Sequence, residues 1–473
     1  METGRHGEID IRVEPAVLVG VQLAGSDVDF RASLEELRAL AETAGVRVVG
    51  TLEQRRAAPR GKTYIGKGKV EELALMCREL GAKVVIFDNE LAPTQVAELE
   101  KSLSTKVIDR SELILDIFAN RATTKQAQLQ VEIAQLEYTA PRLRAMWSHL
   151  GQVTGGAPVG VGTRGPGEQQ LEIDRRIVKV KLDRLRRELS EIEARRSREV
   201  RQRRDEHFTA ALVGYTNAGK SSLFNRLTRG GAYAADQLFA TLGTRVEQWN
   251  LGGGNAALLS DTVGFVQRLP HHLVASFRAT LEDAIESHVI LVVLDVADLS
   301  APMQFRTVSS VLDEIGATTQ PRILLLNKVD RLPETWLPED GPDRRLEEWL
   351  ARVPDAMPVS AITGEGLDAL AARVLSLMKG DVRPCVLSMP LSDGRAIDFV
   401  EKRVPVLDRR WTDGRVELSV EIGRRQLEQL LAGGARLTVD GLPPHEALRS
   451  LWPEPARAAP ARPRPHDSFA VGE

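Results

Sequence analysis

The sequence predicts a multidomain α/β protein, and three observations support this fold class. Short apolar runs alternate with amphipathic segments over residues 15–122, which is typical of a small domain with a parallel sheet. Residues 123–206 repeat apolar positions at helical spacing over two long stretches, as in an antiparallel helical hairpin. A glycine-containing loop at 214–221 lies between an apolar run and an amphipathic segment, which is where a phosphate-binding loop lies in an α/β nucleotide-binding domain.

In the first domain, residues 15–122, we expect strands at 17–21, 46–49 and 84–87 and helices at 69–80 and 93–103. We expect Ser33 to cap a further helix that carries Leu34, Leu37 and Leu40 on one face. The motif Gly66-Lys67-Gly68-Lys69 has two interpretations, a second phosphate site or a conformational turn or RNA-facing loop. The motif is too short to be specific, so we favour the turn or loop.

The helical hairpin, residues 123–206, has a heptad-like seam formed by Leu129, Ile133 and Leu136 with Val178, Leu182, Leu185, Leu189 and Ile192. Its apex, residues 151–167, is rich in glycine and longer than a helix–helix connection requires. Six arginines follow at Arg195, Arg196, Arg198, Arg201, Arg203 and Arg204. They form either a solvated face paired with Glu188, Glu191 and Glu193 of the same helix, or a cationic flank that approaches RNA.

The phosphate-binding loop has the spacing G-x-x-x-x-G-K-[ST], and Ser222 follows it at the start of a helix. Glycines allow the backbone N–H groups to turn toward phosphates. Lys220 is expected to contact the β- and γ-phosphates, and the Ser221 hydroxyl is expected to ligate Mg²⁺. The loop residues are Gly214, Tyr215, Thr216, Asn217, Ala218, Gly219, Lys220 and Ser221.

A second motif, Asn327-Lys328-Val329-Asp330, follows an apolar strand and indicates which base the bound nucleotide carries. The Asp330 carboxylate only accepts hydrogen bonds and can take two from N1–H and the exocyclic amine of guanine, a donor pair that adenine lacks. Ser360-Ala361-Ile362 follows another strand and is expected to bring a backbone N–H to guanine O6. The two motifs together predict GTP rather than ATP as the substrate.

Two segments between these motifs are candidates for sensing the γ-phosphate. In Asp261-Thr262-Val263-Gly264, the carboxylate can hold Mg²⁺ through water and the Gly264 N–H can reach the γ-phosphate. In Phe239-Ala240-Thr241, the Thr241 hydroxyl is the candidate that completes the Mg²⁺ shell, with Ser222, Thr244 and Thr262 as competitors. We therefore predict Lys220, Thr241 and Gly264 as catalytic residues and Ser221, Thr241 and Asp261 as Mg²⁺ ligands.

Phe265 follows Gly264 where many GTPases have a glutamine that orients the attacking water. An aromatic ring cannot position water by hydrogen bonding, so we expect slow unassisted hydrolysis. Asn217 adds a second expectation, because phosphate loops with asparagine at this place resemble those of potassium-stimulated GTPases.

The chain resembles the HflX family of translation-factor-class GTPases from about Val17 to Gly433. The resemblance rests on segments 64–69, 107–118, 162–168, 174–176, 236–242 and 261–265, which read YIGKGK, VIDRSELILDIF, GTRGPGE, DRR, DQLFATL and DTVGF. The chain departs from the family at Gly243-Thr244-Arg245, where Asp-Pro-Thr is usual, and at Ala157-Pro158-Val159 in the glycine-rich loop. The resemblance implies GTP hydrolysis and binding to the large ribosomal subunit, either to split stalled ribosomes or to assist subunit biogenesis. Gly162, Arg164 and Gly165 in the hairpin apex are then the candidate contacts to ribosomal RNA.

Two alternatives come from other classes of function. One is an RNA-remodelling NTPase that also uses the first domain. The other is an RNA-binding regulatory scaffold in which GTP serves only as a structural switch.

Composition and the C-terminal segments complete the prediction for this chain of 473 residues. The P-loop domain is expected at 207–378, a small α+β domain at 383–440 and a flexible proline-rich tail at 441–473, in which His445 and His466 are solvent residues. The net charge is −3 and the two cysteines, Cys77 and Cys385, lie far apart, which favours core positions over a disulfide framework or a zinc site. We expect a cytoplasmic monomer without integral membrane association and without DNA as a partner.

Overall fold

The computed structural model describes residues 14–25, 29–153, 166–228, 244–267, 281–332, 344–412 and 414–452, with only the backbone described at 141–153 and 166–175. These residues form two compact units. The first contains the described chain up to Arg196 together with Val266 and Gln267, and the second contains the other described residues from Ser197 onward.

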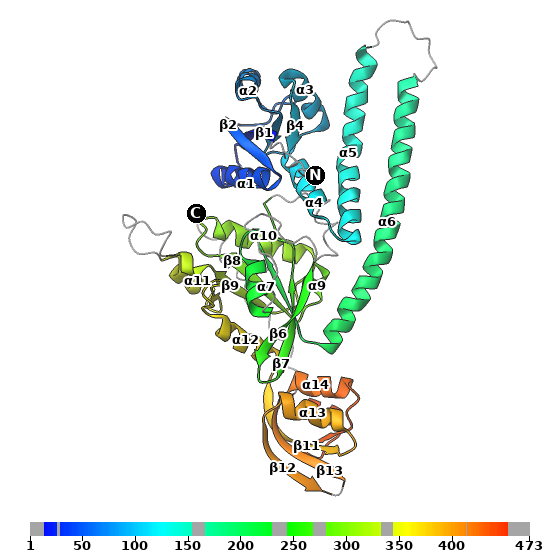
Figure 1. Ribbon diagram of the computed structural model, residues 1–473, viewed down its shortest axis with the longest axis vertical. Helices are drawn as coiled ribbons and strands as arrows, with labels where there is room; N and C mark the ends of the chain where they lie inside the picture. Colours follow the sequence, from blue (N-terminus) through cyan, green and yellow to red (C-terminus); the bar gives the residue numbers. More distant parts are fainter. Residues whose placement is uncertain are drawn as a thin grey trace, which may run out of the picture. The chain divides into compact units, whose positions relative to one another are not determined.

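The first domain is a parallel four-stranded sheet in the order β2-β1-β3-β4 (Figure 1). Its strands are β1 (Glu14–Leu23), β2 (Val46–Arg56), β3 (Val84–Phe87) and β4 (Lys106–Asp109), and its helices are α1 (Phe30–Thr43), α2 (Lys67–Glu79), α3 (Pro93–Leu103) and α4 (Arg110–Arg121). Strand β1 lies in the middle, with Val17, Val19 and Val21 all buried. The predicted parallel α/β domain is confirmed, because strands buried on both faces read as continuous apolar runs.

Two local predictions in this domain were tested by side-chain contacts. Helix α1 begins at Phe30, and Asp29, not Ser33, caps it by accepting from the backbone N–H groups of Arg31 and Ala32. The predicted cap was wrong because the helix starts one turn earlier, which leaves the Ser33 side chain buried inside the domain. The structure also describes the segment at 66–69, where the Gly66 N–H donates to the Gln54 side chain over 3.0 Å.

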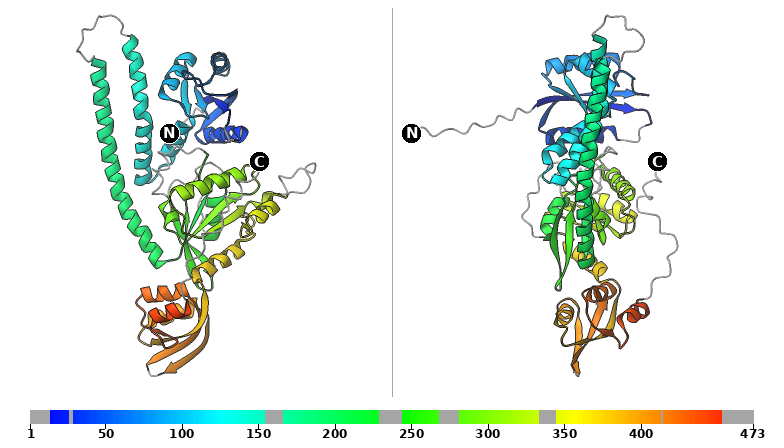
Figure 2. Two further views of the ribbon diagram at one scale, coloured as in Figure 1. Left: turned by 180° about the vertical axis from the view of Figure 1, so that it is seen from behind. Right: turned by 90° about the vertical axis from the view of Figure 1, so that its right-hand side faces the viewer.

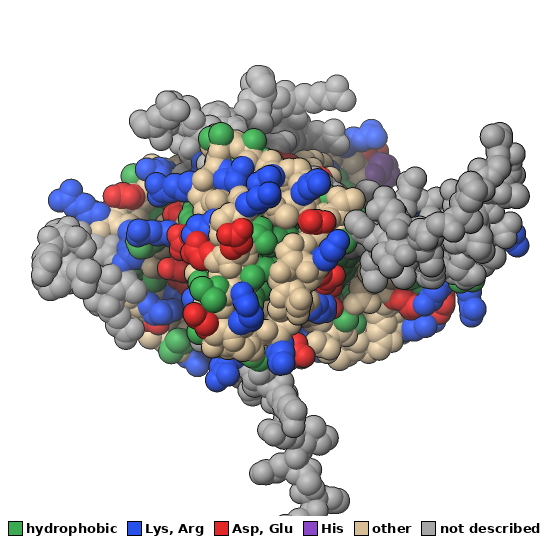
Figure 3. Space-filling view, turned by 90° about the horizontal axis from the view of Figure 1, so that it is seen from above, with side chains coloured by type: hydrophobic (Ala, Val, Ile, Leu, Met, Phe, Trp, Pro, Cys, Tyr) green, Lys and Arg blue, Asp and Glu red, His purple; other side chains and the backbone are tan. Residues whose placement is uncertain are grey.

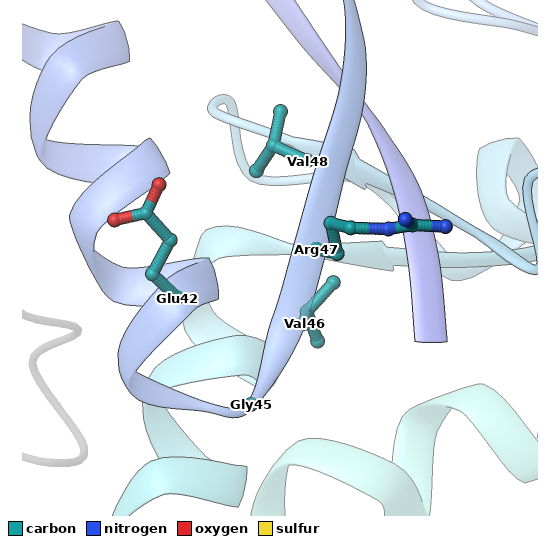
Figure 4. A pocket seen from close by; sticks show the side chains of 5 residues that line it. All are labelled: Glu42, Gly45, Val46, Arg47 and Val48. Carbon is teal, nitrogen blue, oxygen red and sulfur yellow. The ribbon is translucent and has the colours of Figure 1, made fainter. Parts of the chain in front are cut away.

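In that same segment, Lys69 pairs with Glu72 at 2.9 Å. The segment is therefore the start of α2, with Gly66 as the N-cap, and these contacts give it a structural role. A shallow pocket elsewhere in the domain lies at the turn from α1 to β2, where Glu42 and Arg47 extend in different directions (Figure 4). Its polar groups therefore do not converge on a common point as a ligand site requires.

The predicted antiparallel hairpin is formed by α5 (Lys125–Val153) and α6 (Pro166–Glu206), which lie side by side (Figures 1 and 2). Leu129, Ile133 and Leu185 form its buried core, as the heptad-like seam predicts. Ion pairs cross the seam from Lys181 to Glu132 and from Arg186 to Glu137, each at 2.7 Å. Residues 154–165 of the apex lie outside the described residues.

The arginines at the end of α6 include several with partners within the second unit. Arg204 pairs with Glu286 at 2.7 Å, Arg201 with Glu286 at 3.6 Å, and Arg203 with Asp283 at 3.5 Å. Asp283 and Glu286 belong to the short helix α9 (Glu282–Ile285) and its C-cap. Neither interpretation of the arginine cluster anticipated these partners, and these three arginines stabilise the end of the hairpin helix against α9.

The third domain has a six-stranded sheet in the order β10-β9-β8-β5-β7-β6, in which only β6 is antiparallel. The strands are β5 (Thr209–Gly214), β6 (Arg245–Gly252), β7 (Asn255–Asp261), β8 (Val289–Asp295), β9 (Arg322–Asn327) and β10 (Met357–Pro358). The helices are α7 (Lys220–Thr228), α9, α10 (Ala301–Glu314), α11 (Arg345–Arg352) and α12 (Leu367–Lys379), with a single turn η1 (Val329–Arg331). Alternate residues of β5 and β8 enter two separate cores, one on each face, so both faces are covered.

The C-terminal domain is a four-stranded sheet in the order β12-β13-β11-β14. Its strands are β11 (Val382–Pro390), β12 (Val406–Thr412), β13 (Arg415–Gly423) and β14 (Thr438–Val439), and its helices are α13 (Gly394–Arg403), α14 (Arg424–Ala432) and α15 (Pro444–Leu451). The predicted α+β class is confirmed. The predicted start of the tail at residue 441 was wrong, because α15 packs Ala447 and the nearly buried Trp452 into the core of this domain. Pro444 begins a helix there because a first-turn proline loses no backbone hydrogen bond.

His288 connects several segments of the second unit. Its Nδ1 accepts from the Thr209 N–H at 3.1 Å, and its ring stacks on Phe208 with the centroids 4.9 Å apart. Burial, then the charges of Arg425 and Arg204, lower the pKa of His288 from 6.5 to about 4, against a smaller opposing effect of Asp205. The folded protein therefore holds this imidazole neutral.

We expect the free energy of unfolding to fall by about 1–2 kcal/mol between pH 7 and pH 5 through His288. The unfolded chain takes up the proton near pH 6.5 and the folded chain only near pH 4, so stability is lost as the pH falls through this window. Urea unfolding at both pH values measures the change. His288→Asn keeps an acceptor for Thr209 without a titrating ring, and it should remove most of this pH dependence; an unchanged dependence would contradict the assignment.

Candidate functional site

The phosphate-binding loop connects the end of β5 to the start of α7, in the predicted strand–loop–helix order. Gly219 has φ +91°, and a Cβ there would lie 2.2 Å from the Asn327 side-chain nitrogen, so glycine is required. Asn217 has φ +58° and is exposed, a conformation that asparagine tolerates better than most residues. Ser222 lies in the first turn of α7 and is half-buried.

Lys220 is almost completely buried at the helix start, and its Nζ donates to the Tyr215 carbonyl at 2.7 Å. Burial lowers the pKa of Lys220 to about 8; the nearby Asp261 opposes this shift and Lys328 adds to it. The amine is therefore still mainly protonated at neutral pH. An anion at this loop would meet a positive charge whose partner is a neutral carbonyl group.

Ser221 and Asp261 come together from two different segments, with the Ser221 hydroxyl donating to a carboxylate oxygen of Asp261 at 2.7 Å. Asp261 ends β7 and is fully buried. A hydroxyl and a carboxylate side by side offer the hard oxygen ligands that Mg²⁺ prefers, so these residues fit such an ion. Thr262, a competitor for the switch hydroxyl, instead donates its hydroxyl to the Leu212 carbonyl at 2.7 Å.

Gly264 is held against the phosphate-binding loop by its neighbour in the chain. The Phe265 N–H donates to the Gly214 carbonyl at 3.1 Å, and the Thr216 N–H donates to the Phe265 carbonyl at 2.8 Å. A Cβ at Gly264 would lie 2.9 Å from Thr216 Cγ2 and 3.0 Å from Thr216 Cα, so a larger residue there would require the phosphate-binding loop to shift. The Phe265 ring is buried in the core that also contains Tyr215, and Val263 is buried as well.

The predicted base-binding residues also meet in space. The Asn327 side chain donates to the Ala218 carbonyl at 2.8 Å and accepts from the Ala361 N–H at 3.2 Å, so it connects the phosphate-binding loop to the segment after β10. The Ser360 hydroxyl donates to Asp330 Oδ1 at 2.5 Å and orients that carboxylate. Ile362 is 72% exposed beside them.

Sequence reasoning missed Asp295, which pairs with Lys328 at 2.8 Å. Its signal was its place at the end of the buried strand β8, because ligand sites of open α/β sheets lie at the carboxyl ends of the strands. Among the predicted residues, the structure does not describe Phe239, Ala240 and Thr241, nor Gly162, Arg164 and Gly165.

A phosphate-binding loop, an adjacent hydroxyl–carboxylate pair and an Asn-Asp-Ser arrangement, in which Asn327 and Ser360 are buried, define a P-loop GTPase. The chain belongs to the HflX family of GTPases, and it hydrolyses GTP. Four family matches cover most of the chain in order: GTP-binding GTPase N-terminal at 31–119, GTP-binding GTPase Middle Region at 121–203, 50S ribosome-binding GTPase at 209–328, and HflX C-terminal domain at 346–435.

Individual relatives are similar over nearly their full length. The GTPase HflX of Alkalihalophilus pseudofirmus is 38% identical over 86% of this chain and 93% of its own, and that of Escherichia coli is 38% identical over the same shares. The GTPase HflX of Lacrimispora saccharolytica is 43% identical over 77% of this chain and 82% of its own. A crystal structure of a GTP-binding protein from Sulfolobus solfataricus in complex with GDP is 24% identical, covers 77% of this chain and 98% of that one, and has a TM-score of 0.41.

Proposed function

We propose that this GTPase binds the large ribosomal subunit and that bound GTP sets the affinity of this docking. The observation that carries the proposal is the joining of a GTPase domain to a long helical hairpin that has its own ion-paired seam. The match of residues 209–328 to a family described as 50S ribosome-binding GTPases supports the choice of partner. In this function the protein splits stalled ribosomes or assists assembly of the subunit.

The distribution of charged side chains favours a contact to RNA that is confined to the hairpin over a contact across a broad cationic surface. On the face that Figure 3 shows, Lys and Arg side chains are intermixed with Asp and Glu, so that face offers no broad cationic surface. Three of the arginines near the end of α6 already pair with α9. The proposal therefore assigns the RNA contact to the apex of the hairpin, at Gly162, Arg164 and Gly165, where an arginine can bind phosphate or stack on a base.

We propose the following roles for the predicted residues of the GTP site. Lys220 neutralises the β- and γ-phosphates, Gly264 donates its N–H to the γ-phosphate, and Asp330 binds the guanine edge. Ser221, Asp261 and Thr241 would hold Mg²⁺, which neutralises charge on the phosphates when it is bound. Potassium beside Asn217 is part of the proposal and rests on that residue alone.

We propose that the protein is cytoplasmic and monomeric. None of the described helices combines the length with the apolar composition that a membrane crossing requires.

Sedimentation of the protein with ribosomal subunits tests this function. We expect co-sedimentation with the large subunit in a non-hydrolysable GTP analogue, and at least tenfold weaker binding in GDP. Arg164→Ala is expected to weaken ribosome binding while GTP affinity stays near wild type, and Arg187→Ala, an exposed arginine elsewhere on α6, is the matched control. Equal binding in both nucleotides would favour a scaffold, and normal binding of Arg164→Ala would remove the apex from the contact.

A further inference from the structure

The phosphate-binding loop carries a buried hydroxyl group, that of Thr216. The Thr216 residue is only 7% exposed, and its Oγ1 has no hydrogen-bond partner within the part of the chain that the structure describes. A buried polar group without a partner costs free energy, and a catalytic role is one of the reasons for keeping such a group. The surroundings of Thr216 therefore bear on the GTPase reaction.

Thr216 lies beside the two residues that we assign to the γ-phosphate, Lys220 and Gly264. Lys220 Nζ donates to the carbonyl of Tyr215, the carbonyl that is bonded to the Thr216 nitrogen. A Cβ built at Gly264 would lie 2.9 Å from both Lys220 Nζ and Thr216 Cγ2, so the three residues meet at one point. The Thr216 N–H also donates to the Phe265 carbonyl at 2.8 Å, which fixes the loop next to Gly264.

Two other hydroxyl groups of the site already donate to protein acceptors. The Ser221 hydroxyl donates to Asp261 and the Thr262 hydroxyl donates to a backbone carbonyl, each at 2.7 Å. The Phe265 ring has no hydrogen-bonding group and lies in the core. The Thr216 hydroxyl has no such acceptor among the described residues, so it can donate one hydrogen bond and accept another at the same time.

Hydrolysis of GTP needs a group with these properties, because a water molecule must be held in line with the bond that breaks. The water oxygen forms a bond to the γ-phosphorus while the bond from that phosphorus to the β,γ-bridging oxygen breaks, and the bonding electrons stay with GDP. A proton of the water passes to an oxygen of the released phosphate. The protein therefore has to orient the water but does not have to take its proton.

We propose that Thr216 is a catalytic residue of the GTPase reaction, whose hydroxyl donates to a γ-phosphate oxygen and accepts a hydrogen bond from the attacking water. Its contribution is the orientation of that water. A single hydroxyl that also serves the phosphate is a weaker device than a dedicated glutamine, which agrees with slow hydrolysis in the absence of ribosomes. The proposal rests on the roles proposed above for Lys220 and Gly264, and it does not depend on the ribosome.

Thr216→Val tests the proposal, because valine has nearly the shape of threonine and lacks the hydroxyl. We expect the ribosome-free rate of hydrolysis of bound GTP to fall by about 10- to 100-fold, as for one lost hydrogen bond to a charged group. The affinity for GDP should stay unchanged, and the affinity for a non-hydrolysable GTP analogue should fall by much less than the rate. The unfolding temperature should not fall, because the hydroxyl has no protein partner among the described residues.

Two further variants separate the hydroxyl from the shape of the side chain. Thr216→Ser keeps the hydroxyl and should retain about half of the wild-type rate or more. Thr307→Val is the matched control, because it removes a hydroxyl that donates to a carbonyl within its own helix, α10, at 3.1 Å. This control should leave the rate of hydrolysis unchanged.

The measurement is single-turnover hydrolysis by the full chain without ribosomes, with the protein in excess over GTP and well above its dissociation constant, so that weaker binding alone does not lower the rate. Nucleotide affinities and thermal unfolding are recorded for each variant in parallel. A rate of Thr216→Val within about twofold of wild type would overturn the proposal. A rate of Thr216→Ser as low as that of Thr216→Val would also overturn it, since the hydroxyl would then not be the active group.

Lys220→Ala distinguishes failure of this proposal from failure of the site on which it rests. If Lys220→Ala left the affinity for GTP unchanged, the phosphate site would be wrongly assigned, and the role of Thr216 would fail with it. If Lys220→Ala lost GTP binding while Thr216→Val hydrolysed GTP normally, only the role of Thr216 would be wrong. Failure of ribosome binding would affect neither result, since no ribosome is present.

Discussion

Replacing Asp330 with asparagine is expected to change the preferred nucleotide from GTP to XTP. The carboxylate accepts from two guanine N–H groups, whereas the asparagine amide presents an N–H₂ that matches the carbonyl of xanthine. Loss of two hydrogen bonds to a charged acceptor costs about 1.5–3 kcal/mol each, so GTP affinity should fall by about 100-fold or more. Competition titration of GTP against XTP measures the change in preference.

Ser360→Ala provides the matched control for this change. It removes the hydroxyl that donates to Asp330 Oδ1 but keeps the carboxylate itself. We expect guanine to remain preferred in this variant, with a decrease in affinity of about tenfold, as for one lost hydrogen bond. If Asp330→Asn kept its selectivity for GTP, the assignment of Asp330 to the base would be wrong, and Asn327 would be left as a purely structural connection between loops.

The sequence allowed prediction of those parts of the fold and site that depend on neighbouring residues. The glycine and lysine of the phosphate-binding loop form a local pattern, and the structure places them between β5 and α7 as expected. The hairpin seam was predictable for the same reason, since Leu129, Ile133 and Leu185 repeat at helical spacing. In these cases the chemistry of a short segment determines its structure.

Predictions failed where a distant partner decides between two local choices. Both Asp29 and Ser33 are good helix caps, and burial of Ser33 against Asp88, 55 positions away, decides in favour of Asp29. Prolines after residue 441 suggested a tail, but the buried indole of Trp452 keeps α15 in the C-terminal core. Long-range packing of this kind cannot be read from the periodicity of one sequence.

The same reason explains why the ion pair of Glu36 with Arg110 was not predicted. A glutamate on the polar side of an amphipathic helix normally faces water, and nothing in the local sequence of α1 distinguishes Glu36 from the exposed Glu35. Only the fold brings the ends of β3 and β4 beside it and makes Arg110 its partner.

Free of ribosomes, the protein is expected to hydrolyse GTP slowly, and binding to the large subunit should accelerate turnover by about 10³- to 10⁵-fold, as when a missing catalytic group is supplied in trans. The physical reason is that Phe265 replaces a water-orienting glutamine, and its ring lies in the core instead of facing the site. Single-turnover assays with and without large subunits, in potassium and in sodium salts, measure the acceleration. Faster turnover in potassium would support an ion beside Asn217, and equal rates would remove that ion from the mechanism.

Phe265→Gln tests whether a glutamine at this position is enough to raise the intrinsic rate of GTP hydrolysis. Because the side chain at 265 points into the core with Tyr215, a glutamine there should not reach the attacking water, and the intrinsic rate should stay low. The substitution should instead lower the free energy of unfolding by about 3–5 kcal/mol, as for other losses of a buried phenylalanine, so the rate must be measured below the unfolding temperature of the variant. A rate raised tenfold or more by Phe265→Gln would mean that this residue faces the nucleotide and that ribosomes are not needed to position the water. A low rate in the variant, together with strong stimulation of the wild type, would place the missing catalytic contribution on the ribosome or in the segment that the ribosome orders.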